Sequence, residues 1–153
     1  MEKKKKAARY QRIYKQLDGL VESEKNPISR MSSIAAVLHH KMEYFFWTGF
    51  YLLIEGELLV HSYQGPVACM KLKKNSGVCW AGIDRKESVV VDEVEKFPGH
   101  IACDSRSKSE IVVPLRDING DVYGVLDVDS SELNSFDEID ALWLEKIVEL
   151  INK

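Results

Sequence analysis

Long apolar segments are missing from this sequence. No run approaches the roughly 20 apolar residues that a membrane-spanning helix needs. The basic residues 3–6 resemble the start of a secretory signal, but polar and charged residues follow them where the apolar part should be, among them Arg9, Arg12 and Lys15. These two absences predict an intracellular, cytoplasmic protein whose cysteines are reduced at rest.

An excess of positive charge is also missing. The formal net charge is -3 and the sequence pI is about 5.8, so no global basic field favours nucleic acid. The single basic run, Lys3 to Lys6, could touch RNA or anionic lipid, but it is more typical of a solvated helix start. We therefore expect neither a nucleic-acid partner nor a membrane partner.

Internal repeats and linkers rich in proline, glycine or serine are absent, which predicts one domain over residues 1–153. Apolar residues at helical spacing predict an N-terminal helix over about residues 3–22. Asn26 and Pro27 suit the N-cap and first position of a second helix that runs towards His40. A last helix is expected near the C-terminus, with Ser135 and Glu138 as a capping box.

Between these helices the pattern changes to short apolar segments separated by glycine and proline, which is typical of strands. The expected strands are 44–54, 58–63, 67–72 and 89–91, followed by a hairpin of 110–116 and 122–129 around Asn119-Gly120. Residues 92–109 are predicted to be irregular. The resulting fold class is α+β: an antiparallel sheet with N- and C-terminal helices packed on one face and a cysteine-bearing active-site loop on the other.

Only three cysteines are present, at positions 69, 79 and 103, and no C-x-x-C pair occurs. An odd, widely spaced set does not suit a structural disulfide framework. Zinc bound by the three thiols and His100 is one alternative, which the spacing disfavours. Packing in the core is another, and it suits Cys69 and Cys79 as well as any other role.

Cys103 differs from the other two cysteines because it lies in an irregular polar segment. A thiolate there could attack an electrophilic sulfur or oxygen, become a sulfenic acid and condense with a second cysteine. Such a thiolate needs a lowered pKa, and His100 is a candidate for lowering it. The segment therefore predicts redox catalysis by Cys103.

Three carboxylates are predicted to share one side of the hairpin. A two-residue turn at Asn119-Gly120 places Glu110 opposite Asp129 and Val112 opposite Asp127, so the three acidic side chains project together. The apolar side of the same hairpin should face the core, and consists of Ile111, Val113, Leu115, Leu126 and Val128. Pro114 could shift this register. Such a cluster suits a cationic substrate such as an ammonium group, with a divalent metal as the alternative.

Several segments together resemble one family. They are 47–52 (WTGFYL), 64–69 (QGPVAC), 77–79 (GVC), 97–105 (FPGHIACDS), 109–115 (SEIVVPL) and 124–130 (GVLDVDS). In these segments the chain resembles the GAF-fold free methionine-(R)-sulfoxide reductases, from about Tyr10 to the C-terminus. Trp80 is a departure, since the family usually has glycine at that position.

The resemblance implies a single GAF-like domain that reduces free L-methionine-(R)-S-oxide to methionine. It implies that Cys103 is the nucleophile and Cys69 the resolving thiol, with Cys79 as a possible auxiliary thiol. The substrate-binding residues it implies are Glu110, Asp127, Asp129, Trp47 and Tyr51. It further implies thioredoxin as the reductant, a homodimer, and no cofactor or metal. A GAF-type sensor of a small ligand, or a redox switch without turnover, is the alternative.

Overall fold

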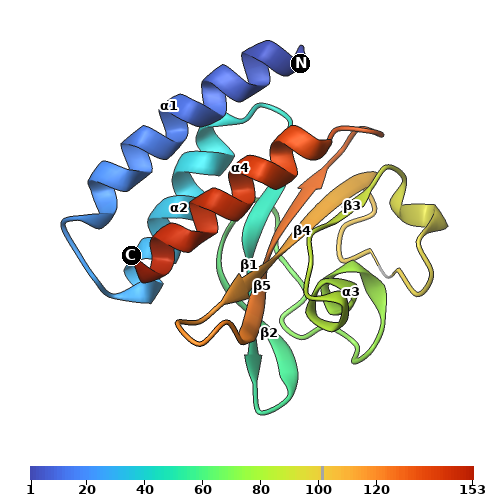
Figure 1. Cartoon of the computed structure of the whole chain (residues 1–153). Coiled ribbons are helices and arrows are strands. Elements are labelled where there is room, and N and C mark those ends of the chain that lie inside the picture. The colour runs from blue at the N-terminus through green and yellow to red at the C-terminus, as the bar shows by residue number, and fades with distance from the viewer. Residues whose placement is uncertain (101) are drawn as a thin grey trace.

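The computed structural model of the chain describes residues 1–100 and 102–153. Within these residues a five-stranded antiparallel sheet forms the centre, in the order β2-β1-β5-β4-β3 (Figure 1). The strands are β1 (Trp47–Ile54), β2 (Glu57–Gln64), β3 (Val89–Val91), β4 (Ser109–Arg116) and β5 (Val122–Ser130). The helices are α1 (Lys3–Val21), α2 (Pro27–Lys41), α3 (Gly77–Arg85) and α4 (Glu138–Glu149), with short 3-10 turns at Val94–Lys96 and Leu150–Asn152. The α+β class predicted from the sequence is confirmed.

Helices α1, α2 and α4 cover one face of the sheet, and α3 lies on the other (Figure 1). The apolar side of the predicted hairpin faces the first group of helices, where all five of its predicted side chains are buried in the main core. That placement fixes which side of β4 and β5 is left for the polar residues, because side chains alternate across a sheet. No helix in the described part of the chain is long and apolar enough to span a membrane.

The basic start of α1 is exposed at Lys3, Lys4 and Lys5, as predicted for a solvated helix start, but Lys6 is buried. Lys6 is only 4% exposed and lies 2.7 Å from the carboxylate of Asp140, which is 0% exposed. The other Asp140 oxygen accepts hydrogen bonds from the Tyr10 and Tyr44 hydroxyls at 2.6 and 2.5 Å. A buried charge needs such partners, so this network ties the first turn of α1 to the beginning of α4.

Two predicted helix starts can be compared with the structure. Asn26 caps α2 as expected, because its side chain accepts from the Ile28 and Ser29 amides. The capping box of α4 is formed by Asp137 and Asp140 rather than by Ser135 and Glu138. The predicted capping box was wrong by two residues. The Asp140 side chain that completes the actual box also binds Lys6 in the buried network.

The segment 67–72 was predicted to be a strand and is not one. Val67 and Met70 are 84% and 80% exposed, and the segment contributes only an isolated bridge between Lys71 and Leu59. Helix α3 was missed altogether, because it has nine residues and includes Gly77 and Gly82, which lower helix propensity.

Gly82 has a packing role in α3. A Cβ at this position would lie 2.7 Å from a Val112 methyl carbon of β4. The absence of a side chain therefore lets α3 pack closely on the sheet beside the polar side of the hairpin.

The hairpin keeps the predicted register by a different route. Glu110 pairs with Asp129 and Val112 with Asp127, as expected. The turn has three residues, 118–120, with Gly120 alone at positive φ, and the register shifts between Leu115 and Arg116. The extra turn residue and this β-bulge compensate each other. Pro114 does not disturb the register, because it lies past the end of the short partner strand β3.

Candidate active site

A cavity opens on the α3 side of the sheet, and it brings together residues that are far apart in the sequence. Its lining includes seven of the eight predicted site residues: Trp47, Tyr51, Cys79, Cys103, Glu110, Asp127 and Asp129. The eighth, Cys69, is covalently bonded to one of these. The positions predicted from the sequence therefore converge on one place.

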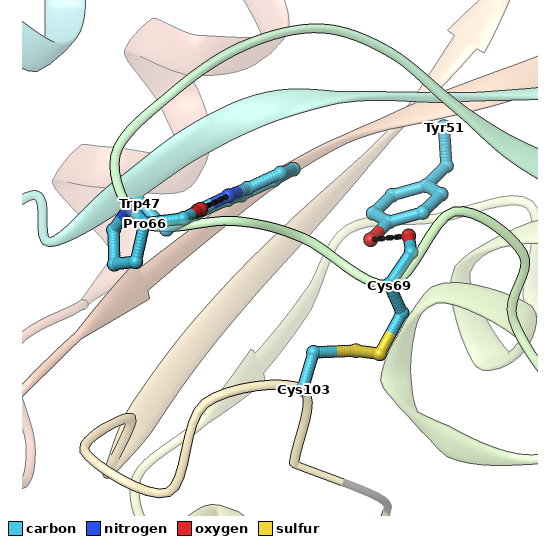
Figure 2. Close-up of a disulfide and its surroundings, with 5 residues drawn as sticks. All are labelled: Trp47, Tyr51, Pro66, Cys69 and Cys103. Atoms are coloured by element: carbon cyan, nitrogen blue, oxygen red, sulfur yellow. Dashed lines mark hydrogen bonds between the residues drawn. A yellow bond between two sulfur atoms is a disulfide. The ribbon is translucent and has the colours of Figure 1, made fainter.

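Cys69 and Cys103 form a disulfide across 34 residues of sequence, with an S–S distance of 2.01 Å and a Cα–Cα distance of 5.5 Å (Figure 2). Both residues lie outside helices and strands, and Cys103 is the more exposed of the two. This disulfide is incompatible with the alternative in which all three cysteines and His100 bind zinc. The structure describes the oxidised form of this pair. That the cysteines are reduced at rest stays a prediction.

Two aromatic side chains of β1 hold the segment that carries Cys69 (Figure 2). The Trp47 indole N–H donates to the carbonyl oxygen of Pro66 at 3.1 Å, and the Tyr51 hydroxyl donates to that of Cys69 at 2.9 Å. Trp47 also stacks on Tyr51 and on Tyr63, with centroid distances of 5.8 and 5.3 Å. These contacts give an irregular segment a fixed position next to the sheet.

Gly49 makes the Trp47 arrangement possible, and sequence reasoning overlooked its role. It lies between Trp47 and Tyr51 on β1 and pairs with Asp127 of β5. A Cβ here would lie 2.6 Å from the Trp47 ring and 2.3 Å from the Tyr63 Cβ. The indole can therefore cross the strand only because position 49 has no side chain.

The segment around Cys103 is held by charged and polar contacts. Arg106 binds both oxygens of Asp104, and its guanidinium lies 4.9 Å from the centre of the Phe46 ring. The hydrogen bonds from Arg106 lower the pKa of Asp104 to about 2. On the other side, the Ser76 hydroxyl donates to the carbonyl of Gly99 at 2.7 Å, which connects the beginning of α3 to this segment.

The three acidic residues of the hairpin lie at the base of the cavity. Glu110 and Asp127 are 5% and 6% exposed, and Asp129 is half-buried. Burial, followed by repulsion from Asp127 and Asp129, raises the pKa of Glu110 well above its usual value. Burial also raises the pKa of Asp127, and burial with the Asp127 charge raises that of Asp129. Burial therefore shifts this cluster towards its protonated forms, and an added cation would stabilise the ionised ones.

Cys79 is the remaining cysteine, and it is a free, buried thiol on α3. Its sulfur atom lies within 4.8 Å of carboxyl oxygens of Glu110 and Asp127. Burial and the neighbouring carboxylates raise its pKa well above the ordinary value for a thiol. Cys79 is therefore protonated near neutral pH, which is unsuited to a role as the nucleophile.

His100 lines the cavity, but its chemistry differs from the prediction. Burial lowers the pKa of its imidazole, so the ring is neutral near pH 7. Its Nε2 atom is buried and makes no hydrogen bond within the described part of the chain. A neutral ring supplies no positive charge to lower the pKa of the Cys103 thiol.

Lys73 was missed by the sequence analysis. Among the described residues that line the cavity it is the one lysine or arginine, and it is exposed. It precedes α3, whose first residues Gly77 and Val78 line the same cavity. Lys73 was not predicted to lie at the site because 67–72 was interpreted as a strand and the residues after it as a connection.

Trp80, the residue that departs from the resembled family, is buried in the smaller core cluster on the α3 side of the sheet. It is not among the residues that line the cavity. The Trp80 side chain therefore belongs to the packing between α3 and the sheet and not to the cavity wall.

Comparison with known proteins supports this picture. A family model described as "GAF domain" matches residues 35–152. The chain is 46% identical over 148 residues to GAF domain-containing protein A of Dictyostelium discoideum, covering 96% of this chain and 92% of that protein. It is 37% identical over 143 residues to a free methionine-R-sulfoxide reductase of Saccharomyces cerevisiae, covering 89% and 79%. It is also similar to the solved structure of such a reductase from Neisseria meningitidis in complex with its substrate, with a TM-score of 0.91, 40% identity, and coverage of 96% and 88%.

Proposed function

The chain belongs to the GAF domain family and, within it, to the free methionine-R-sulfoxide reductases, and on this basis we propose that it reduces free L-methionine-(R)-S-oxide to methionine. The observation that carries the proposal is the disulfide between Cys69 and Cys103 at a cavity with three carboxyl groups. In the proposed reaction one sulfur atom of this pair attacks the substrate, and the other then forms the disulfide with it.

In the proposed first step the Cys103 thiolate attacks the sulfoxide sulfur. The oxygen and one proton pass to Cys103, so Cys103 becomes a sulfenic acid and the substrate sulfur becomes a thioether. A carboxyl group of the cluster supplies the proton, because its raised pKa favours the protonated form. Exposure of Cys103 supports its role as the nucleophile, while burial of Cys79 argues against Cys79 in that role.

In the second step Cys69 attacks the sulfenic acid, water leaves, and the disulfide forms. The hydrogen bonds from Trp47 and Tyr51 support this step, because they hold the Cys69 segment next to the cavity. An external dithiol then reduces the disulfide, and we propose that thioredoxin is this reductant. The electrons come from thiols alone, so the cycle requires neither a metal nor an organic cofactor.

The substrate is proposed to bind with its ammonium group at Glu110, Asp127 and Asp129. This arrangement relieves the repulsion among the three carboxyl groups, which no buried lysine or arginine of the cavity wall offsets in the described residues. Its carboxylate would then lie towards Lys73 and the beginning of α3, where peptide N–H groups favour an anion. Trp47 and Tyr51 would provide apolar walls for the methyl-sulfoxide end.

The experiment is to incubate the protein with L-methionine-(R)-S-oxide and dithiothreitol, or with a thioredoxin system, and to measure methionine. We expect turnover on the free amino acid and little on its N-acetyl derivative, which has a neutral amide in place of the ammonium group. Ligand binding without methionine production would instead identify a sensor. Comparable rates on the free and N-acetylated substrates would contradict the role of the carboxyl groups.

We also propose that the protein is a homodimer, as membership of this family implies. The test is the molar mass in solution, measured by light scattering and compared with the 17.5 kDa chain. A mass of one chain at micromolar concentration would contradict the proposal.

A further inference from the structure

Cys79 is the one cysteine that the proposed reaction does not use, although it lies in the cavity. Its sulfur atom, a carboxyl oxygen of Glu110 and a carboxyl oxygen of Asp127 all lie within 4.8 Å of one another. The three side chains come from α3, β4 and β5, and all three are buried. The fold therefore brings one sulfur atom and two oxygen atoms close enough together to bind one ion.

A second, independent observation points to a cation at this place. Asp127 is 6% exposed and lines the cavity, yet its Oδ1 atom has no hydrogen-bond partner within the described part of the chain. A buried carboxylate oxygen without a donor is costly, and the cost disappears when a cation binds it. A carboxyl oxygen of Glu110 lies within 4.8 Å of a carboxyl oxygen of Asp127, so a cation between them would be held by both groups.

We propose that Cys79, Glu110 and Asp127 form a binding site for a thiophilic divalent cation such as Zn²⁺ or Cd²⁺. The donor set decides the class of ion. Mg²⁺ and Ca²⁺ prefer oxygen ligands alone, whereas a thiolate with two carboxylates suits zinc and its heavier relatives. Zinc bonds are about 2.3 Å to sulfur and about 2.0–2.2 Å to oxygen, so small side-chain rotations bring the three atoms to one ion.

Binding would replace the proton of the Cys79 thiol, which leaves to solvent as the metal–sulfur bond forms, with no change of oxidation state. The neighbouring carboxylates oppose a bare thiolate, but a doubly charged ion reverses this effect, because each acidic group then stabilises the complex. The lining of the cavity includes all three ligands, so an ion can reach them from outside.

The functional consequence is competition, and this part rests on the proposed function. Glu110 and Asp127 are also the groups proposed to bind the substrate ammonium. A metal ion on them excludes that ammonium group, so zinc becomes an inhibitor that substrate displaces. The site would make the enzyme sensitive to free zinc independently of the Cys69–Cys103 pair.

The disulfide form of the protein permits a clean test of binding. With Cys69 and Cys103 joined, Cys79 is the only thiol that can ligate a metal. Co²⁺ is the probe, because a cobalt–thiolate bond gives a charge-transfer absorption in the near ultraviolet that oxygen ligands do not give. We expect this band with one ion per chain, its removal by Zn²⁺, and its persistence in the presence of excess Mg²⁺. The absence of the band in the oxidised wild-type protein would overturn the proposal without any need for a variant.

Variants then locate the ligands. Cys79→Ser should lose the charge-transfer band, and Asp127→Asn should weaken cobalt binding. Asp104→Asn is the matched control, because this carboxylate lines the same cavity but is already bound by Arg106. It should leave cobalt binding unchanged. A band that survives Cys79→Ser would place the ion elsewhere and overturn the assignment.

Steady-state kinetics test the competition. Zn²⁺ should raise KM for free methionine sulfoxide and leave kcat unchanged. If the protein shows no turnover, the proposed function fails while the cobalt titration still decides the metal site. If turnover is present and zinc lowers kcat alone, the proposed overlap of the two sites is wrong.

Discussion

Glu110 lies opposite Asp129 in the sheet and beside Asp127, and burial raises the pKa of all three carboxyl groups. Repulsion from Asp127 raises the pKa of Glu110 and of Asp129 further. Such an arrangement lowers stability in the absence of a ligand. It also means that the same three side chains contribute to both the free energy of unfolding and the affinity for a cation. Single substitutions can separate these two quantities.

Replacing Glu110 with glutamine should raise stability at neutral pH while it impairs activity on the free amino acid. A glutamate in the unfolded chain ionises near pH 4.3, whereas folded Glu110 ionises at a higher pH. Between these values the folded state binds more protons, so stability falls as pH rises through this range. Glu110→Gln does not lose stability in this way. Its free energy of unfolding should therefore exceed that of the wild type at neutral pH and equal it below about pH 4.

Urea unfolding at pH 4 and pH 7 measures this difference. Glu149→Gln, at an exposed position, is the control and should follow the wild-type pH dependence. Equal pH dependence for Glu110→Gln and the wild type would show that the cluster does not strain the folded state.

The two cysteines of the disulfide should give different phenotypes when each is replaced by serine. Cys103→Ser should abolish methionine formation, because a hydroxyl group is too weakly acidic to replace the thiolate. Cys69→Ser should form about one methionine per chain and then stall as a sulfenic acid. A rapid-quench measurement distinguishes the two. Full thioredoxin-dependent turnover in Cys69→Ser would transfer the resolving role to another thiol.

Lys73→Ala should raise KM for the free substrate by about fivefold, the upper range for an exposed ion pair, with little change in kcat. The same variant should behave like the wild type on methionine sulfoxide amide, which lacks the carboxylate. Lys74→Ala is the matched control, because Lys74 is also exposed but does not line the cavity. Equal effects of the two substitutions on KM would indicate a general electrostatic effect.

At the scale of single elements, the hairpin shows why sequence reasoning reached part of the site. Alternation along β4 and β5 is strict, so the apolar side chains of Ile111 and Val128 determined the direction of the acidic ones. The turn was wrong in detail, since Asn119 has no positive φ. The register survived because the β-bulge restores it before Asp127.

Helix α3 and the segment before it could not be derived in this way. Their positions depend on contacts that sequence patterns do not encode, such as the close approach of Gly82 to Val112 and the hydrogen bond from Trp47 to Pro66. Lys73 and Gly49 were overlooked for the same reason. Cys79 was found only because cysteine is rare in the chain, and its neighbours became apparent from the three-dimensional fold.

The contact between α1 and α4 provides a prediction at this scale. Lys6→Met should lower the free energy of unfolding by about 3–5 kcal/mol, because it leaves the buried Asp140 carboxylate without its cation. Lys3→Met is the control, since Lys3 pairs with Glu138 at the surface and should contribute nothing measurable. Chemical denaturation of both variants, compared at equal m-value, tests the difference. Similar losses in both variants would contradict the role of the buried network.

At the scale of the whole molecule, the two faces of the sheet have different roles. One face carries the main apolar core under α1, α2 and α4, and the other carries the cavity beside α3. Because the same strands β4 and β5 serve both faces, changes in the cavity act on a sheet that the core already supports. We propose that residues 1–153 form one cooperative domain.

Oxidised and reduced protein should therefore each unfold in a single transition. The oxidised form should be more stable by about 2–4 kcal/mol, because the disulfide closes a loop of 34 residues in the unfolded chain. Calorimetry of the two redox forms tests both statements. Two resolved transitions in either form would show that parts of the chain fold separately.

The β-bulge beside Leu115 has a consequence for how such a sequence can change over time. It lies between the loop at 118–120 and the pairs that align Glu110, Asp127 and Asp129. An insertion or deletion in the loop can be absorbed there, because a bulge takes up a one-residue mismatch between neighbouring strands. The length of the loop is thus free to drift among descendants of this chain while the alignment of the acidic residues is inherited unchanged.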